Sequence, residues 1–420
     1  MRQMKDSGIQ WIKEIPVTWK LKKNKYNFTL DKSIIGAKWD NTQLLSLTKY
    51  GVKAINDGEQ TGKVPTSLAT YQKVSVNDIV MCLFDLDCSA VFSGKSDFDG
   101  MISPAYKCFK CLPHLYPQYV DYYFRTVFVD RKYMRYSKNV RYSLNADEFM
   151  ALPILVPPLD EQERIAAFLD KECSKIDSIY ADVEKQIETL EQYKRSVFTG
   201  AVTKGLNPNV EMKNSGISYV GEIPQHWELH PVYYYFAEGK KSNAACKEEN
   251  LLSLSYGKVI RKDINTNGGL LPASFSTYNI VNKDDIIIRP TDLQNDKRSL
   301  RTGLVKERGI ITSAYIDLVP YKGVNSHFYH YLLHSYDIMK VFYNMGNGVR
   351  QGLNYSEFSK LILITPSKAE QQEIVAYLDK KCVEIESIIA DKKKQLEVLE
   401  NFKKSLIYEY VTGKREVVNE

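Results

Sequence analysis

The chain has 420 residues, of which 44% are hydrophobic and 26% are charged, and its formal net charge is +6. This length predicts two or three domains with sizeable cores. No stretch approaches 18 unbroken apolar residues and the N-terminus has no apolar signal region, so we expect neither a transmembrane helix nor a secreted protein. The odd number of cysteines, seven, fits free thiols in a reducing cytoplasm.

Residues 1–158 are predicted to form a first globular region of mixed α and β structure. Short β-rich apolar runs alternate with polar turns, and an amphipathic helix and a short apolar strand follow them. The predicted strands are 43–48, 78–86, 104–112 and 152–158, and the helix is 116–134.

A long helix is predicted over 159–199. No Gly or Pro falls between Asp160 and Phe198, and helix-forming residues are abundant there. At about 1.5 Å per residue such a helix is roughly 58 Å long, far longer than an ordinary globular helix. Asp160 is a suitable N-cap. Residues 200–212 contain Gly, Pro and Asn without periodicity, which is typical of a linker.

The rest of the chain repeats this order. A second globular region is predicted over 213–367, a second long helix over 368–408 and a tail over 409–420. EIPVTW from Glu14 recurs as EIPQHW from Glu222, VRYSLN from Val140 as VRQGLN from Val349, and the helix from Asp160 as that from Ala369. These offsets are 208 or 209 residues, so the chain contains two copies of one unit of about that length.

Both long helices carry two apolar rows with a seven-residue period, which is the pattern of a coiled-coil seam. Two independent amphipathic helices are the alternative. Because the linker is too short to span a whole helix, at most about 45 Å, an antiparallel pair is favoured, with a globular region at each end. The rows are Ala166, Cys173, Tyr180 and Ile187 with Leu169, Ile176, Val183, Leu190 and Val197, and Val375, Cys382, Ile389 and Leu396 with Leu378, Ile385, Leu399 and Leu406.

The excess positive charge lies in the two globular regions, which favours a polyanionic partner there, with a solvated basic surface as the alternative. The loops 137–145, 291–303 and 346–354 combine basic and amide side chains, which pair with DNA phosphates and base edges. The candidate DNA contacts are Lys138, Arg141, Arg298, Arg301, Asn347 and Arg350.

Signals for catalysis are weak. There is no phosphate-binding P-loop and no GxGxxG after a strand. Cys82, Cys88, Cys108 and Cys111 have no counterparts at matching positions in the second half, so we interpret them as free thiols rather than as a zinc site. His330 and His334 share a helix but lack the general-base Glu of a metalloprotease motif. We expect no catalytic residue and no metal.

The helix openings PPLDEQERIAAFLD and PSKAEQQEIVAYLD, the EIPxxW segments and VRYSLN/VRQGLN resemble the specificity subunit of type I restriction–modification systems, over nearly the whole chain. The resemblance implies an α+β fold in which two mixed α/β target recognition domains are joined by two long helices forming an antiparallel coiled coil. Each domain would read one half of a bipartite DNA target. The second opening, PSKAEQ, departs from the family's usual PPLxEQ.

The resemblance also implies partners. Two modification subunits would dock on the helices and bring the S-adenosylmethionine site, and a restriction subunit would use ATP and Mg²⁺, so no cofactor is expected in this chain. Our candidates for partner binding are Glu161, Gln162, Glu370 and Gln371, with helix capping as the alternative. Two other functions are alternatives. A coiled-coil scaffold with two protein-binding domains would show no salt-dependent DNA affinity, and a self-contained restriction enzyme would need motifs that the chain lacks.

Overall fold

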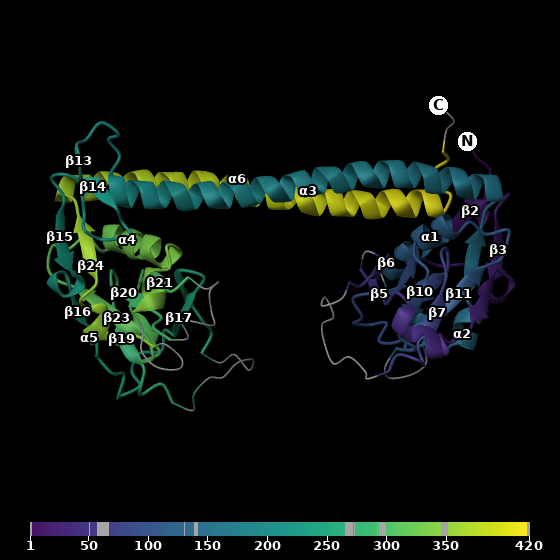
Figure 1. Ribbon diagram of the computed structural model, residues 1–420, viewed down its shortest axis with the longest axis horizontal. Helices are drawn as coiled ribbons and strands as arrows, with labels where there is room; N and C mark the ends of the chain where they lie inside the picture. Colours follow the sequence, from purple (N-terminus) through teal and green to yellow (C-terminus); the bar gives the residue numbers. More distant parts are fainter. Residues whose placement is uncertain are drawn as a thin grey trace. The chain divides into compact units, whose positions relative to one another are not determined.

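The protein is described by a computed structural model that covers residues 2–49, 51–56, 67–129, 131–137, 142–264, 272, 274–291, 293, 300–345 and 352–417. The chain divides into two compact units. The first comprises Met1–Glu184 with Lys394–Glu420, and the second comprises Lys185–Lys393. Each unit therefore contains a globular region, the beginning of one long helix and the end of the other (Figure 1).

The globular region of the first unit is built from short antiparallel strands and two helices. Its central sheet has the order β4-β11-β8-β9, and four two-stranded sheets, β1-β2, β3-β12, β5-β6 and β7-β10, surround it. The helices are α1 (Pro117–Val129) and α2 (Ala146–Ala151). The strands are β1 (Met4–Asp6), β2 (Glu14–Pro16), β3 (Lys20–Lys23), β4 (Phe28–Asp31), β5 (Leu45–Thr48), β6 (Gly51–Ala54), β7 (Gln72–Val74), β8 (Ile79–Met81), β9 (Ser93–Lys95), β10 (Gly100–Ile102), β11 (Lys107–Cys111) and β12 (Pro153–Val156).

The second unit repeats this topology strand for strand. Its central sheet has the order β16-β23-β20-β21, with pairs β13-β14, β15-β24, β17-β18 and β19-β22. The helices are α4 (Ser326–Ile338) and α5 (Tyr355–Phe358). The strands are β13 (Met212–Asn214), β14 (Glu222–Pro224), β15 (Glu228–Pro231), β16 (Phe236–Glu238), β17 (Leu252–Ser255), β18 (Lys258–Arg261), β19 (Asn279–Val281), β20 (Ile286–Ile288), β21 (Thr302–Leu304), β22 (Gly309–Ile311), β23 (Ile316–Pro320) and β24 (Ile362–Thr365).

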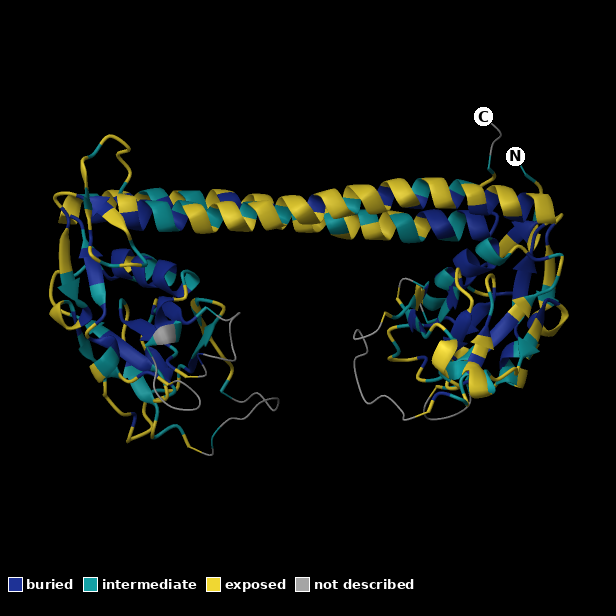
Figure 2. Cartoon of the chain, in the orientation of Figure 1, coloured by how far each residue is buried: buried dark blue, intermediate teal, exposed yellow. Residues whose placement is uncertain are grey.

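Each central sheet separates two apolar cores, because successive side chains of a strand point to opposite faces. In β11, Phe109 belongs to the core shared with α1, whereas Cys108 belongs to a smaller core with Leu45 and Val74. In β20, Ile286 and Ile288 face the core shared with α4, and Ile287 faces the smaller core. The buried strands stand out in dark blue in Figure 2. The larger core in each unit also receives residues from both long helices.

The long helices are α3 (Leu159–Lys204) and α6 (Lys368–Val411). Both begin at or within one residue of the predicted start and continue past the predicted ends at 199 and 408. Residues 200–204 are therefore helix rather than linker, and the reason is tertiary: Ala201 and Val202 are buried in the large core of the second unit. In the same way, Tyr410 and Val411 of α6 are buried in the large core of the first unit. No described helix combines the length and hydropathy needed to cross a membrane.

Within each unit the two helices pack side by side in opposite directions. In the first unit Asp177 of α3 lies 2.6 Å from Lys403 of α6, and nine residues earlier in α3 the ring of Phe168 meets that of Tyr410, further along α6, with centroids 4.4 Å apart. In the second unit Lys194 of α3 lies 2.6 Å from Glu386 of α6.

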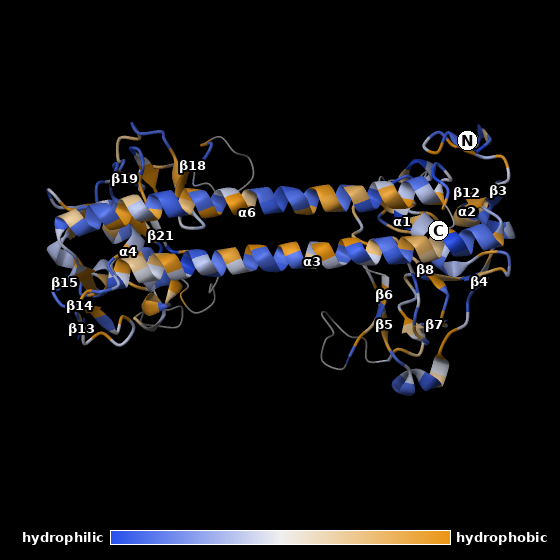
Figure 3. Ribbon diagram, turned by 90° about the horizontal axis from the view of Figure 1, so that it is seen from above, coloured by the Kyte–Doolittle hydropathy of each residue, from blue (hydrophilic) through white to orange (hydrophobic). Residues whose placement is uncertain are grey.

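The predicted seam is confirmed, because every residue of the four seven-residue rows is buried or half-buried. The apolar residues recur along both helices in Figure 3.

The second unit buries two carboxyl groups beside its central sheet. Burial raises the pKa of Asp317 in β23 to about 8, and the negative charge of Asp285 adds to the rise. Burial also raises the pKa of Asp285, to about 6. Oδ1 of Asp317 has no hydrogen-bond partner among the described residues. Oδ2 packs against Gly239, since a Cβ on that glycine would lie only 1.9 Å from it. Cys108 is the counterpart of Asp317 in the first unit, so this pair belongs to one repeat alone.

Replacing Asp317 by Asn should change the pH dependence of stability. The folded-state pKa of Asp317 lies above its ordinary value of 3.8. This carboxyl therefore contributes fully to stability below about pH 3.8 and loses its contribution as the pH rises through about 8. An uncharged amide removes this loss. We expect the free energy of unfolding of Asp317→Asn, relative to the unmodified protein, to rise by about 3–4 kcal/mol between about pH 5 and about pH 8 in urea titrations. An equal difference at both pH values would contradict the assignment.

Candidate nucleic-acid and partner interfaces

Most of the predicted DNA contacts lie outside the described residues. These are Lys138, Arg141, Arg298, Asn347 and Arg350, so their role stays a prediction. The structure does describe the backbone from which their loops depart. In the first unit the N–H of Leu144 donates to the carbonyl oxygen of Leu83 at 2.7 Å, and in the second the N–H of Leu353 donates to that of Pro290 at 2.9 Å. The chain that follows each loop is therefore held against the chain that follows β8 or β20.

This anchoring joins two of the predicted basic loops in the second unit. Pro290 stands at the start of the 291–303 loop, and Leu353 stands at the end of the 346–354 loop. Their hydrogen bond brings the end of the 346–354 loop next to the start of the 291–303 loop, where β20 of the central sheet ends. Neighbouring loops on a rigid sheet are a common arrangement for recognition surfaces. The sequence named both loops, but their adjacency depends on the pairing of distant strands.

Arg301 is the one predicted DNA contact that the structure describes, and its side chain is fully buried. Its guanidinium donates to the carbonyl oxygens of Thr291 at 2.6 Å and Arg289 at 3.4 Å, and it lies 5.2 Å from the ring centroid of Tyr343. A guanidinium turned into its own domain does not reach a duplex, so its position does not support the prediction for Arg301. It instead binds the backbone at Arg289 and Thr291, shortly after β20.

The first unit uses an arginine in a similar way. The guanidinium of Arg131 donates to the carbonyl oxygens of Leu86 at 2.9 Å and Ser89 at 3.1 Å, in the segment between β8 and β9. Arg301 does so for the segment between β20 and β21. Bidentate guanidinium donors hold carbonyl groups of a loop in a fixed arrangement. Arg131 follows α1, whereas Arg301 directly precedes β21. Although they lie at different places in the repeat, each arginine holds backbone carbonyl groups in the corresponding segment, between β8 and β9 or between β20 and β21.

The predicted partner-binding residues have partners within their own units. Gln162 is fully buried, and its amide accepts from the N–H of Tyr116 at 2.8 Å and donates to the carbonyl oxygens of His114 and Pro157 at 3.0 and 2.9 Å. Gln371 is 5% exposed and donates to the carbonyl oxygen of Pro366 at 3.0 Å. Both amides tie the first turn of a long helix to the strand-to-helix connection before it.

The glutamates of the same openings bind the tryptophans of the EIPxxW segments. Trp19 Nε1 donates to Glu161 Oε2 at 2.9 Å, and Arg2 lies 2.5 Å from Oε1 of the same carboxylate. Trp227 Nε1 donates to Glu370 at 3.3 Å, and His226 lies 2.9 Å from that carboxylate. The locations of these glutamates and of Gln162 and Gln371 therefore do not support partner binding by these four residues.

The same tryptophans also contact the end of the other long helix. Gly413 follows α6 with a φ of +72°, and a Cβ there would lie 2.4 Å from Pro16 Cδ and 3.2 Å from the Trp19 ring. Gly205 follows α3 with a φ of +78°, and a Cβ there would lie 3.3 Å from the Trp227 ring. Glycine suits both places because it adopts positive φ without a side-chain clash. The EIPxxW segment thus joins the start of one helix to the end of the other.

No group of three or more His, Cys, Asp or Glu side chains that is able to hold a metal ion occurs among the described residues. Cys82 and Cys108 are buried in the small core of the first unit, where burial raises the pKa of both thiols, that of Cys108 to about 12. A thiol with so high a pKa is a poor metal ligand, since the thiolate is the binding form. Their packing agrees with the interpretation of these cysteines as buried thiols.

Comparison with known proteins agrees with this architecture. Residues 236–398 match the family described as Type I restriction modification DNA specificity domain. The chain is 28% identical over 278 residues to the putative type I restriction enzyme MjaX specificity subunit of Methanocaldococcus jannaschii, covering 65% of this chain and 61% of that protein. It is 25% identical over 287 residues to the MjaVIII specificity subunit of the same organism, covering 64% of each.

The chain is similar to the specificity subunits of type I restriction–modification systems. The match spans about three fifths of the length of these curated relatives. Among solved structures, a chain from a study of complex assembly and conformational transition of the type I R-M system has a TM-score of 0.69 at 12% identity, covering 96% of this chain and 99% of that one. The HsdS subunit of Thermoanaerobacter tengcongensis has a TM-score of 0.50 at 13% identity, covering 96% and 98%. The chain therefore shares their fold.

Replacing Gln162 by Ala tests whether the helix opening serves the fold. The change leaves the N–H of Tyr116 and two carbonyl groups without their partner, which should lower the free energy of unfolding by about 1–3 kcal/mol, measured by urea denaturation of the isolated chain. The neighbouring Glu163 is exposed, so Glu163→Ala is a matched control and should change stability by less than about 0.5 kcal/mol. Unchanged stability in Gln162→Ala would return this residue to the candidates for partner binding.

Proposed function

We propose that this specificity subunit is the DNA-reading component of a type I restriction–modification complex, in which each unit reads one half of a bipartite target. The observation that carries the proposal is the duplication. A chain that matches a DNA specificity domain over 236–398 repeats the same strand order in its first half. Two copies of one reading fold with different loops suit a target with two different halves.

The charge distribution supports a nucleic-acid partner. The excess of Lys and Arg lies outside the paired helices. Phosphate contacts from such side chains position a protein on the duplex, and a few side chains then read base edges in the grooves. The loops that carry Arg141, Arg298 and Arg350 remain our candidates for these contacts. A scaffold that joins two protein partners is the weaker alternative, because it requires neither the basic loops nor the DNA specificity domain.

The subunit itself is proposed to be non-catalytic. Two modification subunits would supply S-adenosylmethionine and methylate adenine, and a restriction subunit, where one is present, would supply the ATP- and Mg²⁺-dependent cleavage. No cofactor is assigned to this chain. All seven cysteines are free thiols, which suits the reducing cytoplasm in which such a complex meets DNA.

The paired helices offer a better docking surface than the four residues predicted first. Ile179 of α3 and Phe402 of α6 are 50% and 53% exposed in the first unit, and Tyr193 of α3 and Ile388 of α6 are 52% and 46% exposed in the second. All four occupy the position just before the first seam row of each seven-residue repeat. In an antiparallel pair these positions flank the same side of the seam. Each unit thus displays one isoleucine and one aromatic ring, which suits one modification subunit per unit.

A map of modified bases tests the proposed function. DNA is sequenced from cells that express the cognate modification subunit with and without this chain. We expect a split motif with a fixed gap to be methylated only when the chain is present. The same map made with Arg350→Ala should show methylation of that motif reduced by about tenfold, the effect of losing one good base or phosphate contact. Methylation that is independent of the chain, with an active modification subunit, would favour the scaffold alternative.

The docking surface is tested by a pair of substitutions in the first unit. Ile179→Glu with Phe402→Glu places two charges where an apolar contact is proposed. We expect co-purification of the modification subunit to fall from two copies per chain to one, because the second unit keeps its own pair. Ser178 is exposed on α3 next to Ile179 and outside this surface, so Ser178→Glu is the control and should leave two copies bound. Two copies bound to the double variant would exclude these residues from the interface.

A further inference from the structure

The hairpin of β17 and β18 in the second unit is a two-stranded ribbon that lies against the central sheet. Leu254 of β17 pairs with Val259 of β18, and both side chains pack against the smaller core of this unit. They cover Gly303 of β21, the strand at one edge of the central sheet, since a Cβ there would lie 2.5 Å from Leu254 and 3.0 Å from Val259. The ribbon is thus held firmly by one of its faces.

The other face of the ribbon carries hydroxyl and basic side chains. Successive residues of a strand point to opposite faces, so Ser253 and Ser255 of β17 lie on this outer face, and their cross-strand partners are Ile260 and Lys258 of β18. Lys258, Ile260 and Lys262 are exposed, and the two serines are half-buried. A narrow strip of polar and basic groups is therefore open to a partner.

Tyr256 stands at the tip of the ribbon and is 83% exposed. The turn consists of Tyr256 and Gly257, with φ values of +45° and +78°. Asn-Gly is a favoured sequence for such a turn, whereas a tyrosine is strained in this left-handed region. Gly257 is closely packed, since a Cβ there would lie 3.1 Å from Leu300 and 3.3 Å from His334. An exposed aromatic ring at a strained and well-supported position points to a function.

The first unit builds the same ribbon from β5 and β6. Its inner residues pack against the smaller core of that unit. Ser46 and Thr48 place hydroxyls at the same two outer positions of the first strand, whereas Lys53 stands where the second unit has Ile260. A shared framework whose outer side chains differ suits two units that read different half-sites.

We propose that the β17–β18 ribbon enters a groove of the target DNA, with its outer face and Tyr256 in contact with the duplex. The major groove is about 12 Å wide and admits a two-stranded β-ribbon. Lys258 and Lys262 bind phosphates, and the serine hydroxyls donate to or accept from base edges. The tyrosine ring packs on a sugar or a base at the edge of the groove. This inference rests on the proposed function and names the element that performs the reading in the second unit.

The surroundings of the ribbon favour DNA over a protein partner. Leu300, which packs on the tip, belongs to the 291–303 loop that carries candidate DNA contacts. Lysine and serine are depleted in protein–protein interfaces, whereas both are common phosphate contacts. Lys258 Nζ lies 3.7 Å from Glu386 of α6, but the two side chains are 68% and 46% exposed. A surface pair of this kind contributes little, so the ammonium group stays open to a phosphate.

Replacing Tyr256 by Asn removes the ring and keeps the turn. Because Asn-Gly is favoured here, the variant should melt at the same temperature as the unmodified protein or higher. Binding is measured by fluorescence anisotropy on the complex with its modification subunits, with a labelled duplex that carries the split motif found by methylation mapping. We expect the affinity to fall about tenfold, the loss of one good contact.

The matched control for the ring is Tyr233→Asn. Tyr233 is 55% exposed and precedes β16, which forms the edge of the central sheet opposite β21. This variant loses an exposed tyrosine of the same unit and should bind the duplex as tightly as the unmodified protein does.

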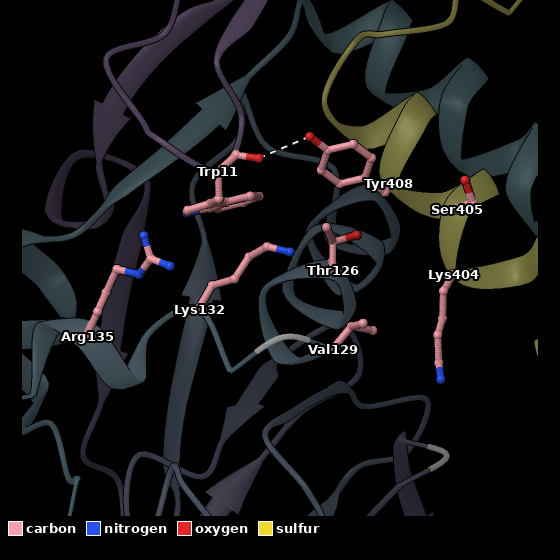
Figure 4. Close-up of a pocket in the computed structure, with 8 residues that line it drawn as sticks. All are labelled: Trp11, Thr126, Val129, Lys132, Arg135, Lys404, Ser405 and Tyr408. Carbon is pink, nitrogen blue, oxygen red and sulfur yellow. Dashed lines mark hydrogen bonds between the residues drawn. The ribbon is translucent and has the colours of Figure 1, made fainter. Parts of the chain in front are cut away.

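Replacing Lys262 by Gln tests a phosphate contact of the outer face. Removal of one such contact should lower the slope of log affinity against log salt concentration by about one. The matched control is Lys404→Gln in the first unit, which removes the same charge from a lysine that lines a recess with Trp11 and Lys132 (Figure 4). This control should leave the slope unchanged.

Weaker binding by Tyr256→Asn, with two modification subunits still bound, supports the ribbon as a DNA reader. Affinity equal to that of the unmodified protein overturns the inference, and chain-dependent methylation of a split motif would then leave the proposed function intact. Loss of a modification subunit from the Tyr256→Asn complex also overturns it, because the ribbon would then be a protein interface. If the unmodified protein neither binds DNA nor directs methylation, the proposed function and this inference fail together.

Discussion

Both units depend on one constraint: each long helix has an apolar seam that it cannot bury by itself. A single helix of this length exposes its seam to water, and helical stability in proteins comes mainly from packing of the apolar face. In each unit the beginning of one helix covers the end of the other, and the last turns continue into the large core through Val202 in one unit and Val411 in the other. Each globular region is thus completed by residues that are distant from it in sequence.

The tryptophan of each EIPxxW segment connects this helix pair to the globular region. Its indole N–H binds the glutamate at the start of one helix, and its ring packs against the glycine that follows the other. Three pieces of chain meet at one side chain, so the direction in which a helix leaves its globular region is fixed within the unit.

The two repeats share the strand order and contacts of this scaffold, but their residues differ at positions beside the loops. Strand order, the Trp–Glu contact and the buried glutamine are common to both. Phe92 in one unit corresponds to Arg301 in the other, Cys108 to Asp317 and Lys132 to Val341. Such differences allow two copies of one fold to carry different surfaces. The buried carboxyl pair belongs to one repeat for this reason.

The sequence by itself determined the repeat, the α+β class, the helix starts and the seam, because these depend on local propensity and on a period that recurs over several turns. Tertiary structure decided the rest. The helix ends lie beyond their predicted positions because the large cores bury Ala201 and Tyr410, whose contacts come from strands far away in sequence. Arg301 was predicted from its residue type to face DNA, yet the pairing of β20 with β21 turns it inward toward Thr291. Glu161 and Gln162 were predicted to bind a partner or to cap the helix, and only the approach of the EIPxxW segment and of His114 reveals the contacts that they make. A side chain's partner depends on contacts between segments, and a single sequence carries no direct record of those contacts.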